Sequence, residues 1–407
     1  VYIMVILSVN AGSSSLKFQA FDMPEEKLLI SGVFEKIGLK DSFYTIKVNG
    51  ERIKHEVELK NHERAFELLV KELIDNNIVD SLEDIKAIGH RVVQGGEYSK
   101  STEITNEVIK MMKEYESFTP LHTKSAISGI KAAQSIAPDA MQVAVFDTSF
   151  HQTIEEENFI YPIPYEWYTE YNIRKFGYHG TSHKYVSSRV NEILGRYNTK
   201  IITCHLGNGA SVCAIEDGMC VNTTLGVSAN SGLMMGSRSG DLDPTIVTYM
   251  MNKLNVTPDE MSNILNKESG LLGVSGISSD SRDIEDGIKK GNSRCALAQK
   301  IFVRRVIDAI AKFYVELGGC DAIVFTAGIG ENSIHTRREV MDGLEVLGVK
   351  VDEEANECRG EEKLITLEDS SIPCYVIPTN EELMMARDAY NLKIERDNKL
   401  ADNDENK

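Results

Sequence analysis

The sequence has little positive charge and no long apolar run. Its 62 aspartate and glutamate residues outnumber 44 lysines and arginines, which gives a formal net charge of −18. Because such a chain repels polyanions and has no dense basic block, we expect neither nucleic acid nor an anionic membrane as a partner. No apolar stretch reaches the roughly 18 residues that a membrane-spanning helix needs, so no membrane segment is predicted.

Cysteine is sparse and irregularly placed. No C-x-x-C pair occurs, and the odd number of cysteines argues against a disulfide framework or a structural zinc site. We therefore expect reduced thiols and a cytoplasmic location. The cysteines are Cys204, Cys213, Cys220, Cys295, Cys320, Cys358 and Cys374.

The remaining composition is that of a folded protein, with 42% apolar and 26% charged residues. A length of 407 residues exceeds one ordinary core and predicts two domains. We place the first at 1–150 and the second at 151–382, with a helix at 383–396 returning to the first. The opening "VYIMVILSV" predicts a buried strand rather than a signal peptide, and the polar residues 397–407 predict a disordered tail.

Both halves of the chain open with the same order of elements. Residues 4–37 predict three strands with a Gly/Ser turn after the first, and residues 200–226 predict the same arrangement. If this repetition is a duplication, two related α/β domains, each a mixed sheet flanked by helices, would enclose a ligand cleft. Helices are expected at 62–77, 106–118, 125–136, 244–254, 258–268 and 295–319, and further strands at 85–91, 141–147 and 320–328.

Three glycine-rich turns follow apolar strands: "NAGSSSLK" (10–17), "HLGNGAS" (205–211) and "TAGIGENS" (326–333). Converging backbone N–H groups bind phosphate, and glycine permits the close approach that this requires. One such turn alone would be interpreted as a tight hairpin, but three favour a bound nucleotide. A Walker motif is absent, and "GIGENS" lacks the third glycine of a dinucleotide fingerprint.

Two arginines and one aspartate stand where phosphoryl chemistry would need them. Arg91 and Arg238 lie near glycines, where a guanidinium can reach a carboxylate or phosphate with two hydrogen bonds. For either arginine alone, a surface ion pair is the ordinary interpretation. Asp147 ends an apolar strand, and its charge is costly there unless a cation or metal is near.

Histidines and C-terminal acids complete the candidates. His179 and His183 are four residues apart, but Gly180 weakens a helix between them, so a phosphoryl-oxygen donor is preferred to a zinc site. His122 is equally well explained as a loop residue. Glu381 and Glu382 suit Mg²⁺ held through water, or the first turn of a helix capped by Thr379 or Asn380, and both interpretations can hold.

Taken together, the motifs resemble the acetate kinase family, which shares a superfamily with sugar kinases, actin and Hsp70-type chaperones. The resemblance runs from "SVNAGSSSLKF" to "PTNEEL" and rests on these two and on "GHRVV", "VAVFDTSFHQT", "HGTSH", "HLGNGASV", "GLMMGSRSGDLDP", "ESGLLGVSG" and "GIGENS". It implies two actin-like (ribonuclease H-like) domains and a homodimer. It also implies Mg²⁺-dependent (or Mn²⁺-dependent) conversion of ATP and acetate to ADP and acetyl phosphate.

The resemblance assigns roles to residues of this chain. Asn10 and Glu381 would hold the metal, Arg91 would bind the acid carboxylate, and Asp147 would be essential. His179 and Arg238 would stabilise the transition state. Implied nucleotide contacts are Lys17, His205, Leu206, Gly207, Asn208, Gly209, Asp280, Ser281, Arg282, Gly328, Ile329, Gly330, Glu331 and Asn332. The acid pocket would use Arg91, Val93, Leu121, His122, Tyr178 and Ala229.

Departures from the family pattern leave alternatives open. Gln94, Thr123, Lys124 and Ala327 differ from the usual residues, as do Asn222, Val227, Ala229, Asn230 and Ser231. Ala229 replaces a proline and would widen or loosen the acid pocket, which makes a propionate or short-chain carboxylate kinase an alternative. Pyrophosphate in place of ATP is a second alternative. An actin- or Hsp70-like ATP switch is a third, and it would need neither Arg91 nor an acid pocket.

Overall fold

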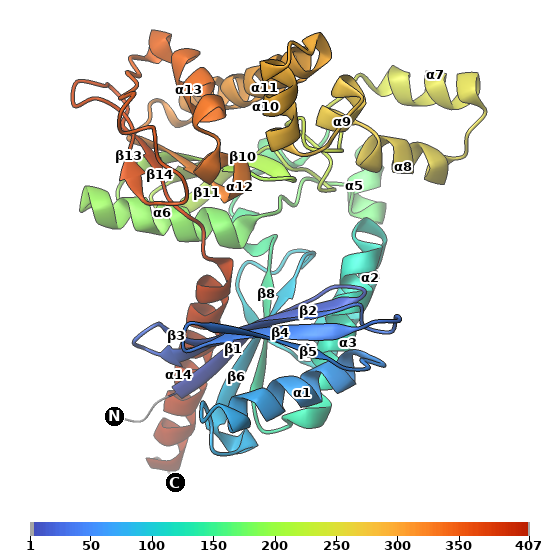
Figure 1. The fold of residues 1–407 in the computed structure, drawn as a ribbon, viewed down its shortest axis with the longest axis vertical. Helices are drawn as coiled ribbons and strands as arrows, with labels where there is room; N and C mark the ends of the chain where they lie inside the picture. Colours follow the sequence, from blue (N-terminus) through green and yellow to red (C-terminus); the bar gives the residue numbers. More distant parts are fainter. Residues whose placement is uncertain (1–3, 406–407) are drawn as a thin grey trace. The chain divides into compact units, whose positions relative to one another are not determined.

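The computed structural model describes residues 4–405 and separates into two compact units (Figure 1). Unit 1 comprises the chain up to Ser149 together with the part from Asn380 onward, and unit 2 is Phe150–Thr379. The C-terminal helix therefore belongs to unit 1. That helix runs from Glu381 to Glu405, which corrects the expected disorder of 397–407 over 397–405. Lys393 pairs with Asp397 one helical turn later and supports the extension. The remaining tail residues, and residues 1–3 of the opening run, lie outside the described part.

The elements of unit 1 are β1 (Met4–Ala11), β2 (Ser15–Met23), β3 (Lys27–Glu35), β4 (Phe43–Val48), β5 (Glu51–Glu56), α1 (His62–Asp75), β6 (Ile85–Val92), β7 (Thr102–Glu103), α2 (Asn106–Glu114), α3 (Pro120–Ile136), β8 (Met141–Phe146) and α14 (Glu381–Glu405). Those of unit 2 are α4 (Glu156–Phe159), α5 (Glu166–Tyr171), α6 (Gly180–Leu194), β9 (Lys200–Leu206), β10 (Ala210–Glu216), β11 (Met219–Thr223), α7 (Pro244–Leu254), α8 (Pro258–Lys267), α9 (Gly270–Ser275), α10 (Ser281–Lys289), α11 (Ser293–Leu317), β12 (Ala322–Thr326), α12 (Ala327–Asn332), α13 (Ile334–Asp342), β13 (Lys363–Leu364) and β14 (Cys374–Val376). Single 3₁₀ turns lie at Leu82–Asp84, Glu116–Phe118, Ser149–His151 and Glu345–Leu347.

The sheet of unit 1 has the strand order β5-β4-β3-β2-β1-β6-β8-β7. Strands β1, β2 and β3 form an antiparallel meander, and β6 and β8 continue the sheet parallel to β1. In the β1–β2 register, Asn10 lies directly opposite Lys17. The two residues therefore project on the same face at the end of the first hairpin.

Alternation along β1 decides which helices cover each face of this sheet. Val5, Leu7 and Val9 belong to a buried cluster with residues of α1 and α3, such as Phe66 and Ala133. The intervening Ser8 points to the other face, where its Oγ donates to the Glu382 carbonyl oxygen of α14 at 2.6 Å. Helices α1 and α3 thus pack on one face and α14 on the other.

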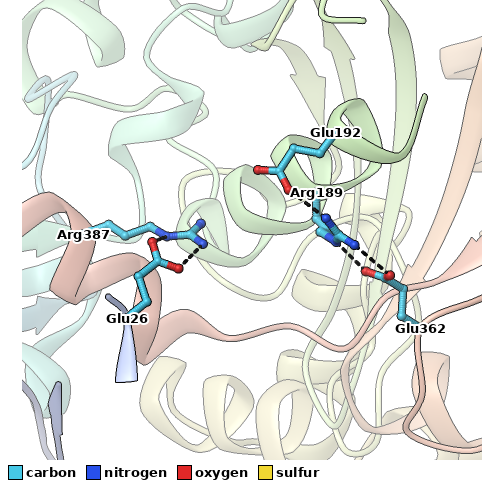
Figure 2. Close-up of polar contacts among 5 residues, drawn as sticks. All are labelled: Glu26, Arg189, Glu192, Glu362 and Arg387. Carbon is cyan, nitrogen blue, oxygen red and sulfur yellow. Dashed lines mark hydrogen bonds and ion pairs between the residues drawn. The ribbon is translucent and has the colours of Figure 1, made fainter. Parts of the chain in front are cut away.

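An ion pair fixes α14 to the hairpin between β2 and β3. Arg387 Nε and Nη2 donate to Glu26 Oε1 and Oε2 at 2.6 and 2.8 Å (Figure 2). Both side chains are partly shielded from solvent. This bidentate geometry is stronger than a single-contact surface pair, and it orients the helix whose first residue is Glu381.

The sheet of unit 2 has the order β11-β10-β9-β12-β14-β13. As in unit 1, an antiparallel meander (β9, β10, β11) is extended by two strands parallel to the first (β12, β14). Helix α6 packs on one face through Val186 and Val190, and α11 contacts β9 and β10. The predicted pair of mixed sheets flanked by helices is confirmed, and the two sheets share one core strand order.

Two local features differ from the expectations. The helix expected at 125–136 begins at Pro120, because proline is well tolerated in a first helical turn. The turn expected at 326–333 is the short helix α12, entered through Ala327 in a left-handed conformation with φ of 65°.

A surface cluster of Arg189, Glu192 and Glu362 joins α6 to the segment before β13 (Figure 2). Of the helices described, none is both long and apolar enough to cross a membrane.

Candidate active site

Partly exposed Arg91 and buried Asp147 form an ion pair at the ends of two neighbouring parallel strands of unit 1. Asp147 follows β8, and its N–H donates to the Val92 carbonyl at 2.9 Å, which extends the β6–β8 ladder. Arg91 Nε and Nη2 donate to Asp147 Oδ1 and Oδ2 at 3.1 and 2.8 Å. The Asp147 side chain is 2% exposed. Attraction to this carboxylate raises the pKa of Arg91, so the guanidinium remains charged.

Glu381 and Asn10 bring further oxygen donors to the same face of the sheet. Asn10 lies two residues beyond Ser8 on β1 and so faces α14, whose first residue is Glu381. Burial raises the pKa of Glu381 to about 7, although Arg91 opposes the rise, and the nearby Asp147 and Glu382 add to it. A carboxyl group in this setting gains by binding a divalent cation. The amide and carboxylate oxygens of these residues are the ligands that Mg²⁺ prefers, so the donor set fits the implied metal.

The residues expected to line an acid pocket are divided between the two units. Val93 follows β6 in unit 1, and Leu121 and His122 lie in the first turn of α3, where Leu121 is 69% exposed. Tyr178 and Ala229 belong to unit 2. There the Tyr178 hydroxyl donates to the Val227 carbonyl at 2.6 Å and so contacts the loop that carries Ala229. Their common role in acid binding stays a prediction.

A cavity of about 590 Å³ in unit 2 brings the three predicted nucleotide stretches together. Its size is in the ordinary range for a small-molecule site. Predicted residues that line it are Gly207, Asn208, Asp280, Ser281, Arg282, Gly328, Ile329 and Asn332. They come from the β9–β10 turn, the start of α10 and the short helix α12, which are far apart in sequence.

Other residues predicted to contact nucleotide do not line this cavity. Lys17 lies in unit 1, exposed on β2. Leu206 is fully buried in the core, and the Gly330 carbonyl accepts from Arg337 at 3.1 Å. Glu331 accepts from the Thr326 hydroxyl and from the Thr379 N–H, each at 3.4 Å. Gly209 and His205 instead lie beside the catalytic candidates of this unit.

His179 and Arg238 converge at Gly209. A Cβ on Gly209 would lie 3.2 Å from Arg238 Nη1 and 3.5 Å from His179 Nε2, so both donors face this turn. Arg238 Nη1 also donates to the Ala229 carbonyl at 3.2 Å, and burial lowers the pKa of Arg238. The ring of His179 stacks on His205 with centroids 4.1 Å apart. Gly180, which was expected to weaken a helix between His179 and His183, is instead the first residue of α6, and His179 lies just before it at φ of 59°.

The sequence is similar to known proteins over nearly its whole length. The model of the acetokinase family matches residues 5–387. This chain belongs to the acetokinase family. Acetate kinase 1 of Listeria monocytogenes is 48% identical over 393 residues, which is 96% of this chain and 99% of that protein. An acetate kinase of Geobacillus is 49% identical over 390 residues, with 95% and 98% covered.

Solved structures agree with this membership. The Porphyromonas gingivalis acetate kinase has a TM-score of 0.91 at 42% identity and covers 95% of this chain and 99% of its own. A propionate kinase from Francisella tularensis has a TM-score of 0.90 at 40% identity, with 96% and 100% covered. Fold similarity therefore does not separate the two acids.

Several residues beside the candidate site or lining its cavity are not among the residues predicted from sequence. Ser211 Oγ lies 2.9 Å from His179 Nδ1 and 2.7 Å from His183 Nε2, so one hydroxyl joins the two imidazoles. Ser211 belongs to the "HLGNGAS" motif, and strand alternation could have placed its side chain on the α6 face. Arg359 gave no such signal, because it stands in a loop remote from every motif. The cavity residues that were missed are Ser279, Glu285, Ser333 and Arg359.

Proposed function

We propose that this chain is an acetate kinase that transfers the γ-phosphoryl group of ATP reversibly to acetate. The observation that carries the proposal is the convergence of three acetokinase nucleotide stretches on one cavity of nucleotide size, in a chain that matches the family over 5–387. A bond forms between an acetate oxygen and the γ-phosphorus while the bond to the departing ADP oxygen breaks. No proton needs to move, because acetate is ionised at neutral pH.

Arg91 is the proposed acid-binding residue. Asp147 occupies its Nε and one N–H of Nη2, which leaves Nη1 and the second N–H of Nη2 for the substrate carboxylate. A guanidinium fixed in this way binds a carboxylate with less loss of conformational freedom than a mobile side chain. Asp147 then acts mainly by holding Arg91 and by balancing charge, since an acetate nucleophile needs no base.

His179 and Arg238 are the proposed donors to the transferring phosphoryl group. Their Nε2 and Nη1 atoms both face Gly209, at the end of a phosphate-binding turn. Donors fixed before the reaction stabilise charge that spreads over the equatorial oxygens in the transition state.

Mg²⁺, or Mn²⁺, is the proposed metal, and Asn10 and Glu381 would hold it. When bound, such an ion neutralises phosphate charge and helps to position the nucleotide. Glu381 must be ionised for this role, and its pKa of about 7 leaves it partly protonated near neutral pH until a cation binds.

We also infer a homodimer, as the family resemblance implied, and a cytoplasmic location, as the cysteine pattern indicated. Helix α7 supports the dimer, because its sequence "PTIVTYMMNKL" is apolar and yet none of its residues is buried. Light scattering behind size-exclusion chromatography would test it. A monomer at micromolar concentration would remove this part of the proposal.

The activity is tested by trapping acyl phosphate with hydroxylamine. Parallel reactions contain acetate, propionate or butyrate, with ATP or pyrophosphate as donor, and with Mg²⁺ or excess chelator. We expect the highest rate with acetate, ATP and Mg²⁺. A preference for propionate would reassign the acid, and a preference for pyrophosphate would reassign the donor. ATP hydrolysis that no acid stimulates would favour a nucleotide switch.

A further inference from the structure

A cluster of three soft donors lies in unit 2, apart from the residues assigned to phosphoryl transfer. It consists of His151 in a 3₁₀ turn, Cys213 on β10 and Cys220 on the neighbouring β11. Cys213 Sγ and Cys220 Sγ are 3.4 Å apart, and His151 Nδ1 is 3.2 Å from Cys220 Sγ. All three ligand atoms lie within 4.8 Å of one another, and all three residues are buried.

The imidazole of His151 is already oriented as a ligand. Its Nε2 lies 2.8 Å from the Tyr178 carbonyl oxygen, which can only accept, so Nε2 carries the proton. Nδ1 therefore presents its lone pair to the sulfur atoms. Metal-binding histidines usually donate their second nitrogen to a carbonyl or carboxylate in this way.

The surroundings can balance the charge of two thiolates. Lys175 Nζ donates to Asn222 Oδ1 and to the Thr223 carbonyl, both at 2.8 Å. Asn222 follows Cys220 by two positions along the chain. A fixed ammonium group here offsets part of the negative charge that metal binding would bring into the core. The site thus has donors, orientation and a counter-charge.

We propose that His151, Cys213 and Cys220 bind a soft d¹⁰ metal ion, with Cu⁺ favoured over Zn²⁺. Two sulfurs and one imidazole select such ions and not Mg²⁺ or Ca²⁺. Metal–sulfur bonds of about 2.3 Å place two sulfurs about 3.8 Å apart in a tetrahedral site and about 4.0 Å apart in a trigonal one, so the pair needs to open by about half an ångström. As the two bonds form, both thiols release their protons.

The number of ligands favours Cu⁺. Structural Zn²⁺ sites take four ligands. Among the residues that the structure describes, no fourth histidine, cysteine, aspartate or glutamate joins this group. The spacing of the two cysteines gave no sign of a metal site, because the histidine comes from a separate segment of the chain.

The test uses untagged, full-length protein, reduced and metal-free, kept free of oxygen. Competition against a chromogenic Cu⁺ chelator and, separately, a Zn²⁺ chelator measures the number of tight equivalents. We expect one, and Cys220→Ser or Cys213→Ser should lose it with at least a 100-fold weaker affinity. Cys374→Ser is the matched control, because Cys374 is a buried thiol near Cys204 and Cys320, outside the cluster. It should keep the equivalent.

X-ray absorption on the wild type decides the case even where a variant fails to fold. We expect two sulfur ligands and one nitrogen ligand, and a rise in melting temperature when the ion is added. The absence of a tight equivalent, or an equivalent that survives Cys220→Ser, overturns the proposal. So does a Cys213–Cys220 disulfide in protein prepared without oxygen. A nucleotide-independent readout keeps this test separate from the proposed kinase activity.

Discussion

Arg91 and Asp147 form a bidentate pair across two parallel strands, with Nε–Oδ1 and Nη2–Oδ2 distances of 3.1 and 2.8 Å. The sequence motifs imply separate roles for the two residues, whereas the pairing shows that Asp147 holds Arg91 in place. Removing the arginine therefore has two effects. It deletes the donor to the acid, and it leaves a buried carboxylate without its partner.

We expect Arg91→Ala to raise the KM for acetate at least tenfold and to lower stability by about 3 to 5 kcal/mol, because a buried charge loses its partner. Asp147→Asn should lower kcat and change the KM for ATP much less. Steady-state kinetics and urea unfolding measure both effects. Arg64→Ala is the control, since Arg64 makes an exposed ion pair with Glu67 and should change neither. Wild-type rates in Arg91→Ala would remove this residue from the mechanism.

Much of the fold follows from the period of the apolar residues. The meanders, the long helix α11 and the strands β6 and β8 were predicted because each alternates or repeats in a short window. The extension of α14 beyond residue 396 was not, because its polar sequence shows no apolar period, and charge pairs such as Lys393–Asp397 support it instead. The start of α6 was also missed, since glycine at a first helical position costs much less than in the interior.

The candidate site residues could be predicted from sequence where they lie in contiguous motifs. Gly207, Asp280 and Gly328 lie in recognisable stretches, and the structure brings them to one cavity. The pairing of Arg91 with Asp147 depends on β6 and β8 being neighbours, which no local pattern states. Ser211 was included in a motif, but its contacts with two histidines depend on where α6 packs.

The chain of hydrogen bonds through Ser211 predicts a positioning role. Burial lowers the pKa of His183 well below its ordinary value, so this ring is neutral. Its Nδ1 lies 2.6 Å from Thr203 Oγ1 and its Nε2 2.7 Å from Ser211 Oγ. If Thr203 donates to His183, His183 donates to Ser211 and Ser211 to His179 Nδ1. Nε2 of His179 then keeps its proton for a phosphoryl oxygen.

We therefore expect Ser211→Ala to lower kcat about 10- to 100-fold with little change in the KM for ATP, and to shift the pH dependence of kcat. Ser211→Thr, which restores the hydroxyl, should recover part of the rate. Ser187→Ala removes another buried serine, on α6, and should leave kcat unchanged. Equal losses in Ser211→Ala and Ser187→Ala would point to packing alone.

Arg337 is expected to fix α12, whose residues Gly328, Ile329 and Asn332 line the cavity, through hydrogen bonds to the backbone. It is fully buried and donates to the carbonyls of Gly330, Asn356 and Cys358 at 2.7 to 3.1 Å. Arg337→Met leaves these oxygens without donors and should lower stability by about 3 kcal/mol or more. The KM for ATP should rise with it.

The neighbouring Arg338 provides the control for Arg337. It is half exposed and pairs with Glu353 at 3.1 Å, so Arg338→Met should change stability by less than about 1 kcal/mol. Thermal unfolding and ATP kinetics of the two variants give the comparison. If both variants lose the same stability, the buried hydrogen bonds of Arg337 do not contribute the expected stabilisation.

Because His90 is buried, we expect the protein to lose stability in mild acid. Burial lowers its pKa from 6.5 to about 4, although its hydrogen bond to Gln142 opposes the shift. Between these two values the unfolded chain binds a proton that the folded chain does not. The free energy of unfolding therefore falls as the pH falls through this range, by up to about 3 kcal/mol from this residue alone. Urea titrations from pH 7 to pH 4 should show the fall, and His90→Gln should make it smaller. A pH dependence that is the same in both proteins would show that this ring is not the source.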